Sequence, residues 1–77
     1  MKWYHGTVTT SRESGPGEVT KMVLSMLRRG ESLNVMRSAA RGEVNRLYRP
    51  EDGWQVSFVD FYEINAETAA LIAEDYK

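Results

Sequence analysis

The chain is 77 residues long, contains no cysteine and carries a formal net charge of -1. A chain of this length supports one hydrophobic core, so residues 1–77 are predicted to form a single domain. The absence of cysteine excludes disulfides and thiolate metal sites, and one histidine cannot anchor zinc, so we expect no metal and no cofactor. No stretch is apolar enough for a signal peptide or a membrane span, and we expect a soluble, cytoplasmic protein.

The charge is distributed unevenly along the chain. Residues 1–50 carry nine Lys or Arg against four Glu, whereas residues 51–77 carry seven Asp or Glu against one Lys. The two parts of the chain therefore have opposite charge. Apolar residues make up 42% of the sequence, which is typical of a folded domain and not of a disordered one.

The first thirty residues predict a strand, a loop and a helix. Residues 2–10 are rich in aromatic and β-branched side chains, which is typical of a strand. Residues 11–17 (SRESGPG) place two glycines around a proline and predict a loop. A helix is then predicted over about residues 17–29, because five apolar residues recur at helical spacing: Val19, Met22, Val23, Met26 and Leu27.

Residues 31–48 allow two interpretations. A helix would place five apolar side chains on one face, at Leu33, Met36, Ala40, Val44 and Leu47. Gly42 would interrupt that helix at a cost of about 1 kcal/mol relative to Ala. Alternatively, residues 33–38 and 43–48 form two short strands that are joined by a turn around Gly42.

The following segment favours the two strands. Residues 49–53 (RPEDG) have proline and glycine where a tight turn needs them, and residues 54–58 then alternate between apolar and polar side chains. A hairpin needs a partner strand before the turn, and only residues 43–48 are available. We therefore predict strands over residues 33–38 and 43–48.

The C-terminal segment predicts a second helix. Asn65 is a suitable N-cap, and Glu67 lies in the positively polarised first turn. Ala69, Ile72, Ala73 and Tyr76 then share one face. The predicted fold is a two-layer α+β domain in the order strand, helix, three-stranded meander, helix, with about four antiparallel strands and both helices on one face of the sheet.

Few residues suggest catalysis. Tyr4-His5-Gly6-Thr7 resembles the tyrosine/histidine-glycine strand motif of ADP-ribosyltransferases, in which the histidine holds the nicotinamide nucleotide. The resemblance covers four residues, and those enzymes need a much longer chain to enclose the dinucleotide. Asp60 and Glu63 could form a carboxylate pair, but no matched histidine or nucleophile accompanies them. We predict that the protein is not an enzyme and has no catalytic residues.

An arginine-rich segment suggests binding. Six arginines lie within residues 28–49, close to Tyr48 and Trp54. Guanidinium groups bind phosphates and aromatic rings stack on unpaired bases, so a nucleic-acid-binding regulator that uses this segment is the alternative function. Arginine and aromatic residues are also enriched in protein–protein hot spots.

The aromatic residues favour a protein partner. Alternation along the last strand sends Trp54, Val56 and Phe58 to one side of the sheet and Val59 and Phe61 to the other, and helices on one face cannot cover both. The leading hypothesis is a small non-catalytic module that docks on another protein, as an accessory, inhibitor or regulator of the kind that phages and mobile elements encode. A small core with exposed aromatics also favours a homodimer. The predicted partner-binding residues are Arg37, Arg41, Arg46, Tyr48, Arg49, Trp54 and Phe61.

Overall fold

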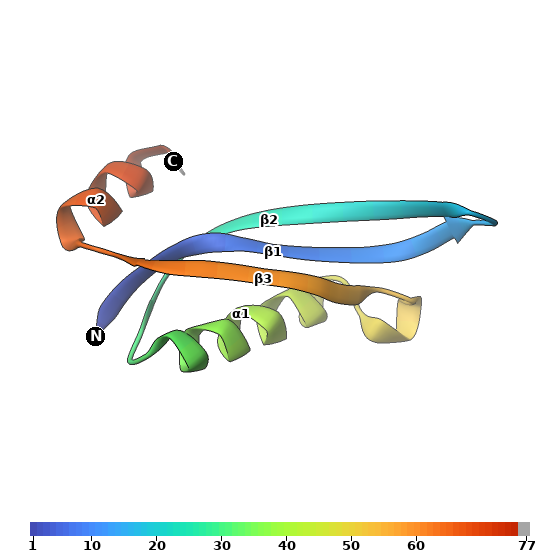
Figure 1. The fold of residues 1–77 in the computed structure, drawn as a ribbon, viewed down its shortest axis with the longest axis horizontal. Helices are drawn as coiled ribbons and strands as arrows, with labels where there is room; N and C mark the ends of the chain where they lie inside the picture. The colour runs from blue at the N-terminus through green and yellow to red at the C-terminus, as the bar shows by residue number, and fades with distance from the viewer. Residues whose placement is uncertain (76–77) are drawn as a thin grey trace.

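The computed structural model describes residues 1–75 (Figure 1). The elements in chain order are strand β1 (Lys2–Gly15), strand β2 (Glu18–Gly30), helix α1 (Leu33–Leu47), the short 3-10 turn η1 (Pro50–Asp52), strand β3 (Gln55–Ile64) and helix α2 (Ala66–Asp75). They form an α+β fold with a three-stranded antiparallel sheet in the order β2-β1-β3. The α+β class is confirmed, but the prediction of four strands and of a helix after the first strand is wrong.

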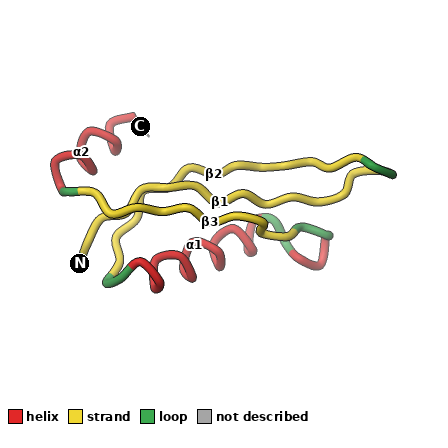
Figure 2. The backbone as a smooth tube through the Cα atoms, viewed as in Figure 1, coloured by secondary structure: helices red, strands yellow, loops and turns green. Residues whose placement is uncertain are grey.

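β1 and β2 form one long hairpin (Figure 2). β1 continues through most of the predicted loop over residues 11–17, and only Pro16 and Gly17 lie outside the strands. Gly17 has a φ of 74°, which suits the second corner of a tight turn after a proline. Because the reversal takes only two residues, the strands pair from Lys2 opposite Gly30 up to the turn.

The predicted helix over residues 17–29 is wrong, because this segment is β2. Its apolar side chains belong to both faces of the sheet, with Met22, Leu24 and Met26 on one face and Val19, Val23 and Leu27 on the other. A strand with apolar residues on both faces loses its alternation, and a subset of these residues matched helical spacing by coincidence. Pairing with β1 decides the outcome, since long-range contacts override local pattern.

The two predicted strands over residues 33–48 are also wrong, because the helical interpretation holds. Ser32 caps α1 by accepting a hydrogen bond from the backbone N–H of Val35 at 3.3 Å. Residues 49–53 do reverse the chain, and Gly53 has the left-handed φ of 92° that the turn needs. They connect α1 to β3, however, and the strand partner of β3 is the distant β1.

Gly42 provides a test of the continuous helix. Apart from the backbone of α1, no atom of residues 1–75 lies within 4 Å of the position that a Cβ would take there. Glycine inside a helix costs about 0.5–1 kcal/mol relative to alanine, so Gly42→Ala is expected to raise the free energy of unfolding by about that amount. Urea denaturation measures the change, and a loss of stability would contradict a regular helix at this position.

α1 covers one face of the sheet and builds the core. Residues that pair across an antiparallel sheet project from the same face, so the strand residues of the core lie side by side beneath the helix. The core cluster consists of Tyr4, Val8, Met26, Met36, Ala40, Val44, Val59 and Phe61.

α2 lies on the opposite side of the sheet from α1, near one end (Figure 1). Its Ala73 lines a small hollow with Leu27, which projects away from the core. The prediction that both helices cover one face is therefore wrong, and much of the second face is left without a helix.

The start of α2 is confirmed. The side-chain oxygen of Asn65 accepts a hydrogen bond from the backbone N–H of Thr68 at 2.8 Å. Ala69 is buried, with Ile72 and Ala73 half-buried beside it, whereas Tyr76 lies outside the described residues. No helix within residues 1–75 is long and apolar enough to span a bilayer.

Candidate functional site: an open sheet face

The sheet face opposite α1 is covered only where α2 lies. We call the remainder the open face, and it consists of Thr7, Thr9, Val23, Phe58, Asp60 and Tyr62. Thr9 pairs with Val23 on one side and with Phe58 on the other, so these three side chains form a row across the sheet. The exposed fractions are 63% for Val23, 59% for Phe58 and 53% for Tyr62. The row therefore presents two apolar side chains to solvent, Val23 and Phe58, on either side of Thr9.

A β-bulge in β3 places Phe58 on this face. Thr9 pairs with Phe58 and Thr10 with Val56, so Ser57 is an extra residue between the two pairs. Val56 consequently packs against the core beneath α1, while Phe58 projects to the other side. The predicted common orientation of Val56 and Phe58 is wrong, because strict alternation does not hold through a bulge.

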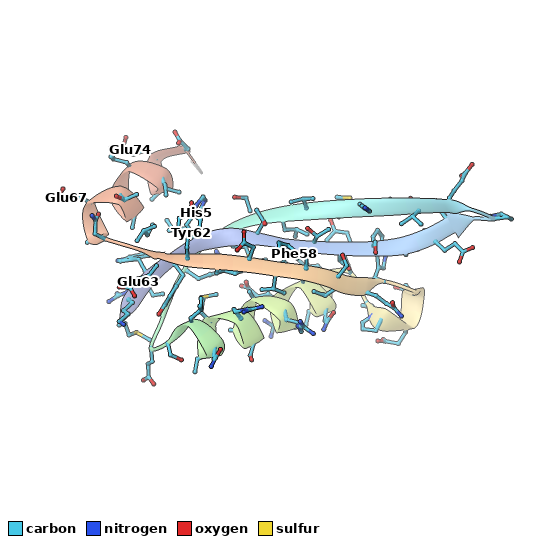
Figure 3. All side chains as sticks on the ribbon, viewed as in Figure 1. His5, Phe58, Tyr62, Glu63, Glu67 and Glu74 are labelled. Atoms are coloured by element: carbon cyan, nitrogen blue, oxygen red, sulfur yellow. The ribbon has the colours of Figure 1, made fainter. Side chains whose placement is uncertain are left out.

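His5 and Tyr62 form the boundary of the open face near α2 (Figure 3). They are directly opposite each other on β1 and β3. The Nδ1 atom of His5 and the Tyr62 hydroxyl are within hydrogen-bond distance at 2.9 Å, and the rings are perpendicular with centroids 5.7 Å apart. This contact joins the Tyr62 ring to the imidazole of the Tyr4-His5-Gly6-Thr7 motif.

Exposed charges of both signs lie on this side of the sheet, because Lys21 and Arg29 of β2 project from the same face as Val23. Asp60 is exposed in the middle of the face and pairs with Thr7 in the sheet register. Glu67 and Glu74 lie on the exposed side of α2, at the end where His5 and Tyr62 meet (Figure 3). Asp60 and the two carboxylates of α2 attract basic groups and repel phosphates locally.

The predicted arginine site is divided by α1. Arg37 and Arg41 line a hollow of about 400 Å³ together with Val59 of β3. Arg46 instead lines a hollow of about 330 Å³ with Arg28 of β2. The arginines therefore lie on two flanks of the helix and do not form one continuous surface.

Two of the six arginines are neutralised by nearby carboxylates. The Nε atom of Arg28 lies 3.1 Å from a carboxylate oxygen of Glu43. Arg49 lies 2.7 Å from Glu51. Neither carboxylate belongs to α2, and the pairing reduces the positive charge that this segment offers to a ligand.

The three predicted aromatic anchors pack against the protein itself. Tyr48 and Trp54 form a perpendicular pair with centroids 5.0 Å apart, and the Arg12 guanidinium lies 5.2 Å from the Trp54 ring centroid. Phe61 is only 6% exposed and belongs to the core. Within residues 1–75, the exposed rings are instead those of Phe58 and Tyr62, which are not in the predicted set.

Comparison of the chain with protein-family models, with curated proteins and with solved structures found no match. Within residues 1–75, no three His, Cys, Asp or Glu side chains are grouped closely enough to hold a metal ion.

Proposed function

We propose that the protein is a small non-catalytic binding module that docks on another protein through its open face. The supporting observation is the row in which the exposed apolar side chains of Val23 and Phe58 lie on either side of Thr9, on a sheet whose other face is covered by α1. Neighbouring exposed apolar side chains on an uncovered sheet face favour a contact site, and aromatic residues are common among interface hot spots.

The chemistry of the open face defines the kind of partner. Phe58 offers a large apolar ring, and burying such a ring completely contributes about 1.5–3 kcal/mol. Asp60 in the same face, with Glu67 and Glu74 on α2, complements positive charge. The proposed partner is therefore a protein surface with apolar side chains and a basic group opposite Asp60.

The alternative function is binding of nucleic acid through the arginine-rich segment. Arg37 and Arg41 are one helical turn apart and, among residues 1–75, form no salt bridge, so they could bind phosphates. We rank this function second because Arg28 and Arg49 are paired with carboxylates. Their pairing weakens the electrostatic attraction on which phosphate binding depends.

A substitution on the open face tests protein docking. Phe58→Ser removes the central ring, whereas Val35→Ser is the matched control, because Val35 is 54% exposed on α1. Proteins that the wild type captures from an extract of the cells that produce it are identified, purified and titrated against each variant. We expect Phe58→Ser to weaken binding by at least about ten-fold, as for a hot-spot residue, and Val35→Ser to leave it unchanged. Equal affinity for wild type and Phe58→Ser would contradict docking through this face.

A salt titration distinguishes nucleic-acid binding from protein docking. Binding of labelled single-stranded and duplex DNA and RNA is measured over a range of salt concentrations for wild type and for Arg37→Gln with Arg41→Gln. Affinity that falls steeply with salt and is lost in the double variant would support nucleic-acid binding by α1. Protein docking alone predicts that neither nucleic acid binds measurably.

A further inference from the structure

β2 is an edge strand that lacks the usual protection against pairing. It is 13 residues long, and within the described chain its only neighbouring strand is β1. Protein edge strands are usually kept short or are interrupted by proline or charge. Between Val19 and Leu27, β2 contains no proline and a single charged residue, Lys21. Its outer edge is therefore suited to accept another strand.

The tip of the hairpin has little support of its own. β3 pairs with β1 only from Trp3 to Ser11, so residues 12–20 project as two strands beyond the rest of the sheet (Figure 1). Val19 in this tip is largely exposed. A two-stranded ribbon is marginally stable in water unless a third strand or a helix packs on it.

We propose that β2 pairs antiparallel with β2 of a second copy of this chain, about a two-fold axis at Val23. In this register Val23 faces its own copy, Met22 faces Leu24 and Val19 faces Leu27, so apolar side chains meet on both faces of the sheet. Glu18 faces Arg28, which also contacts Glu43, so no like charges are directly opposite each other at the two ends. A register centred on Leu24 would instead place Val19 opposite Arg29.

Two hollows beside β2 fit the side chains that this pairing brings in. On the α1 side, the hollow of about 330 Å³ is lined by Leu24, Met26 and Leu47, next to the position of Met22 of the second copy. On the other side, Leu27 and Ala73 line a hollow of about 320 Å³ next to the position of Val19 of the second copy. The hairpin tip of each copy would thus pack against the part of the second copy where α1 and α2 lie beside β2.

The pairing would produce a continuous six-stranded sheet with both α1 helices on one face. The row of Phe58, Thr9 and Val23 would then continue directly into the same row of the second copy. This inference does not depend on the proposed docking function, because it concerns the purified protein alone.

A cysteine at the two-fold axis tests the register. The chain has no other cysteine, so Val23→Cys places the only two thiols of the dimer opposite each other. Directly opposite residues of antiparallel strands have Cα atoms about 4.5–5.5 Å apart, which a disulfide can span. We expect rapid oxidation to a covalent dimer for Val23→Cys and not for the exposed control Val35→Cys. Equal rates of cross-linking for the two variants would overturn the proposal.

Opposite charges at the same position give a second test, measured by analytical ultracentrifugation. Val23→Lys and Val23→Glu should each raise the dimer dissociation constant by about ten-fold or more, because like charges would face each other across the axis. An equimolar mixture should form mixed dimers, and Val35→Lys should dimerise as wild type does. A wild-type protein that stays monomeric up to about 1 mM, or charge variants that fail to form mixed dimers, would overturn the proposal.

Discussion

Replacing Gly6 with alanine is expected to unfold most of the protein. A Cβ at this position would clash with the backbone carbonyl oxygen of Asp60 and lie 2.7 Å from the Cα atom of Phe61. Both neighbours are backbone atoms of β3, so no side chain can rotate to relieve the overlap. We expect a loss of about 3 kcal/mol or more, comparable with the whole stability of a core this small.

Gly15→Ala is the matched control for Gly6→Ala. The nearest atoms to a Cβ at Gly15 belong to the flexible side chain of Glu18, at 3.5 Å or more. Circular dichroism and urea denaturation should show a folded Gly15→Ala protein close to wild type. A Gly6→Ala protein with the wild-type denaturation midpoint would show that β1 and β3 are not packed as closely as described.

Replacing Tyr4 with alanine is expected to have a comparable effect for a different reason. Tyr4 is 2% exposed and is the largest fully buried side chain of the core beneath α1. Truncating a buried aromatic side chain to alanine typically costs about 3–5 kcal/mol, because apolar contacts are lost and a cavity remains. Urea denaturation should therefore show a protein that is largely unfolded even in buffer.

Two controls show whether the loss at Tyr4 comes from removing a buried ring. One removes only the hydroxyl of Tyr4, and the other removes an exposed ring. Tyr4→Phe retains the ring volume, and we expect it to remain folded with a loss of no more than about 1.5 kcal/mol. Phe58→Ala removes a ring from the open face, where we expect a loss below about 1 kcal/mol because the ring is already largely exposed. Similar losses for Tyr4→Ala and Phe58→Ala would contradict the assignment of the covered and open faces.

The elements that the sequence predicts correctly are those with signals in adjacent residues. The aromatic and β-branched residues of the first strand, the cap at Asn65 and the Pro50 to Gly53 turn each have a local physical cause. The structure confirms the strand and the cap and shows that residues 50–53 reverse the chain, but the hairpin predicted at this turn is wrong because the turn joins α1 to β3. It also extends the first strand, because pairing with β2 holds residues 11–15 extended.

The sequence predicts a helix where the structure has β2 and strands where it has α1, because both segments depend on distant partners. β2 has apolar side chains on both faces, which hides the alternation of a strand. α1 contains Gly42, which weakened the helical interpretation even though the position is exposed and tolerates glycine. The Pro16-Gly17 turn beside Val19 and Thr20 was the available signal for a hairpin.

The open face was not predicted from the sequence, for related reasons. The two-strand prediction places Arg37, Arg41 and Arg46 on one surface of the sheet, whereas α1 directs Arg37 and Arg41 to one flank and Arg46 to the other. The bulge at Ser57, which no local pattern revealed, brings Phe58 onto the open face with Val23. A site that spans three strands depends on register, and register cannot be deduced until the strands are correctly assigned.

Site-specific photo-cross-linking tests most directly whether the open face contacts another protein. A photoreactive phenylalanine analogue is introduced at Phe58, or at the control Val35, which is 54% exposed, and cells that produce the protein are irradiated. Docking predicts a covalent adduct with one distinct protein from position 58 and none from position 35. Adducts with nucleic acid, or the same adducts from both positions, would contradict it.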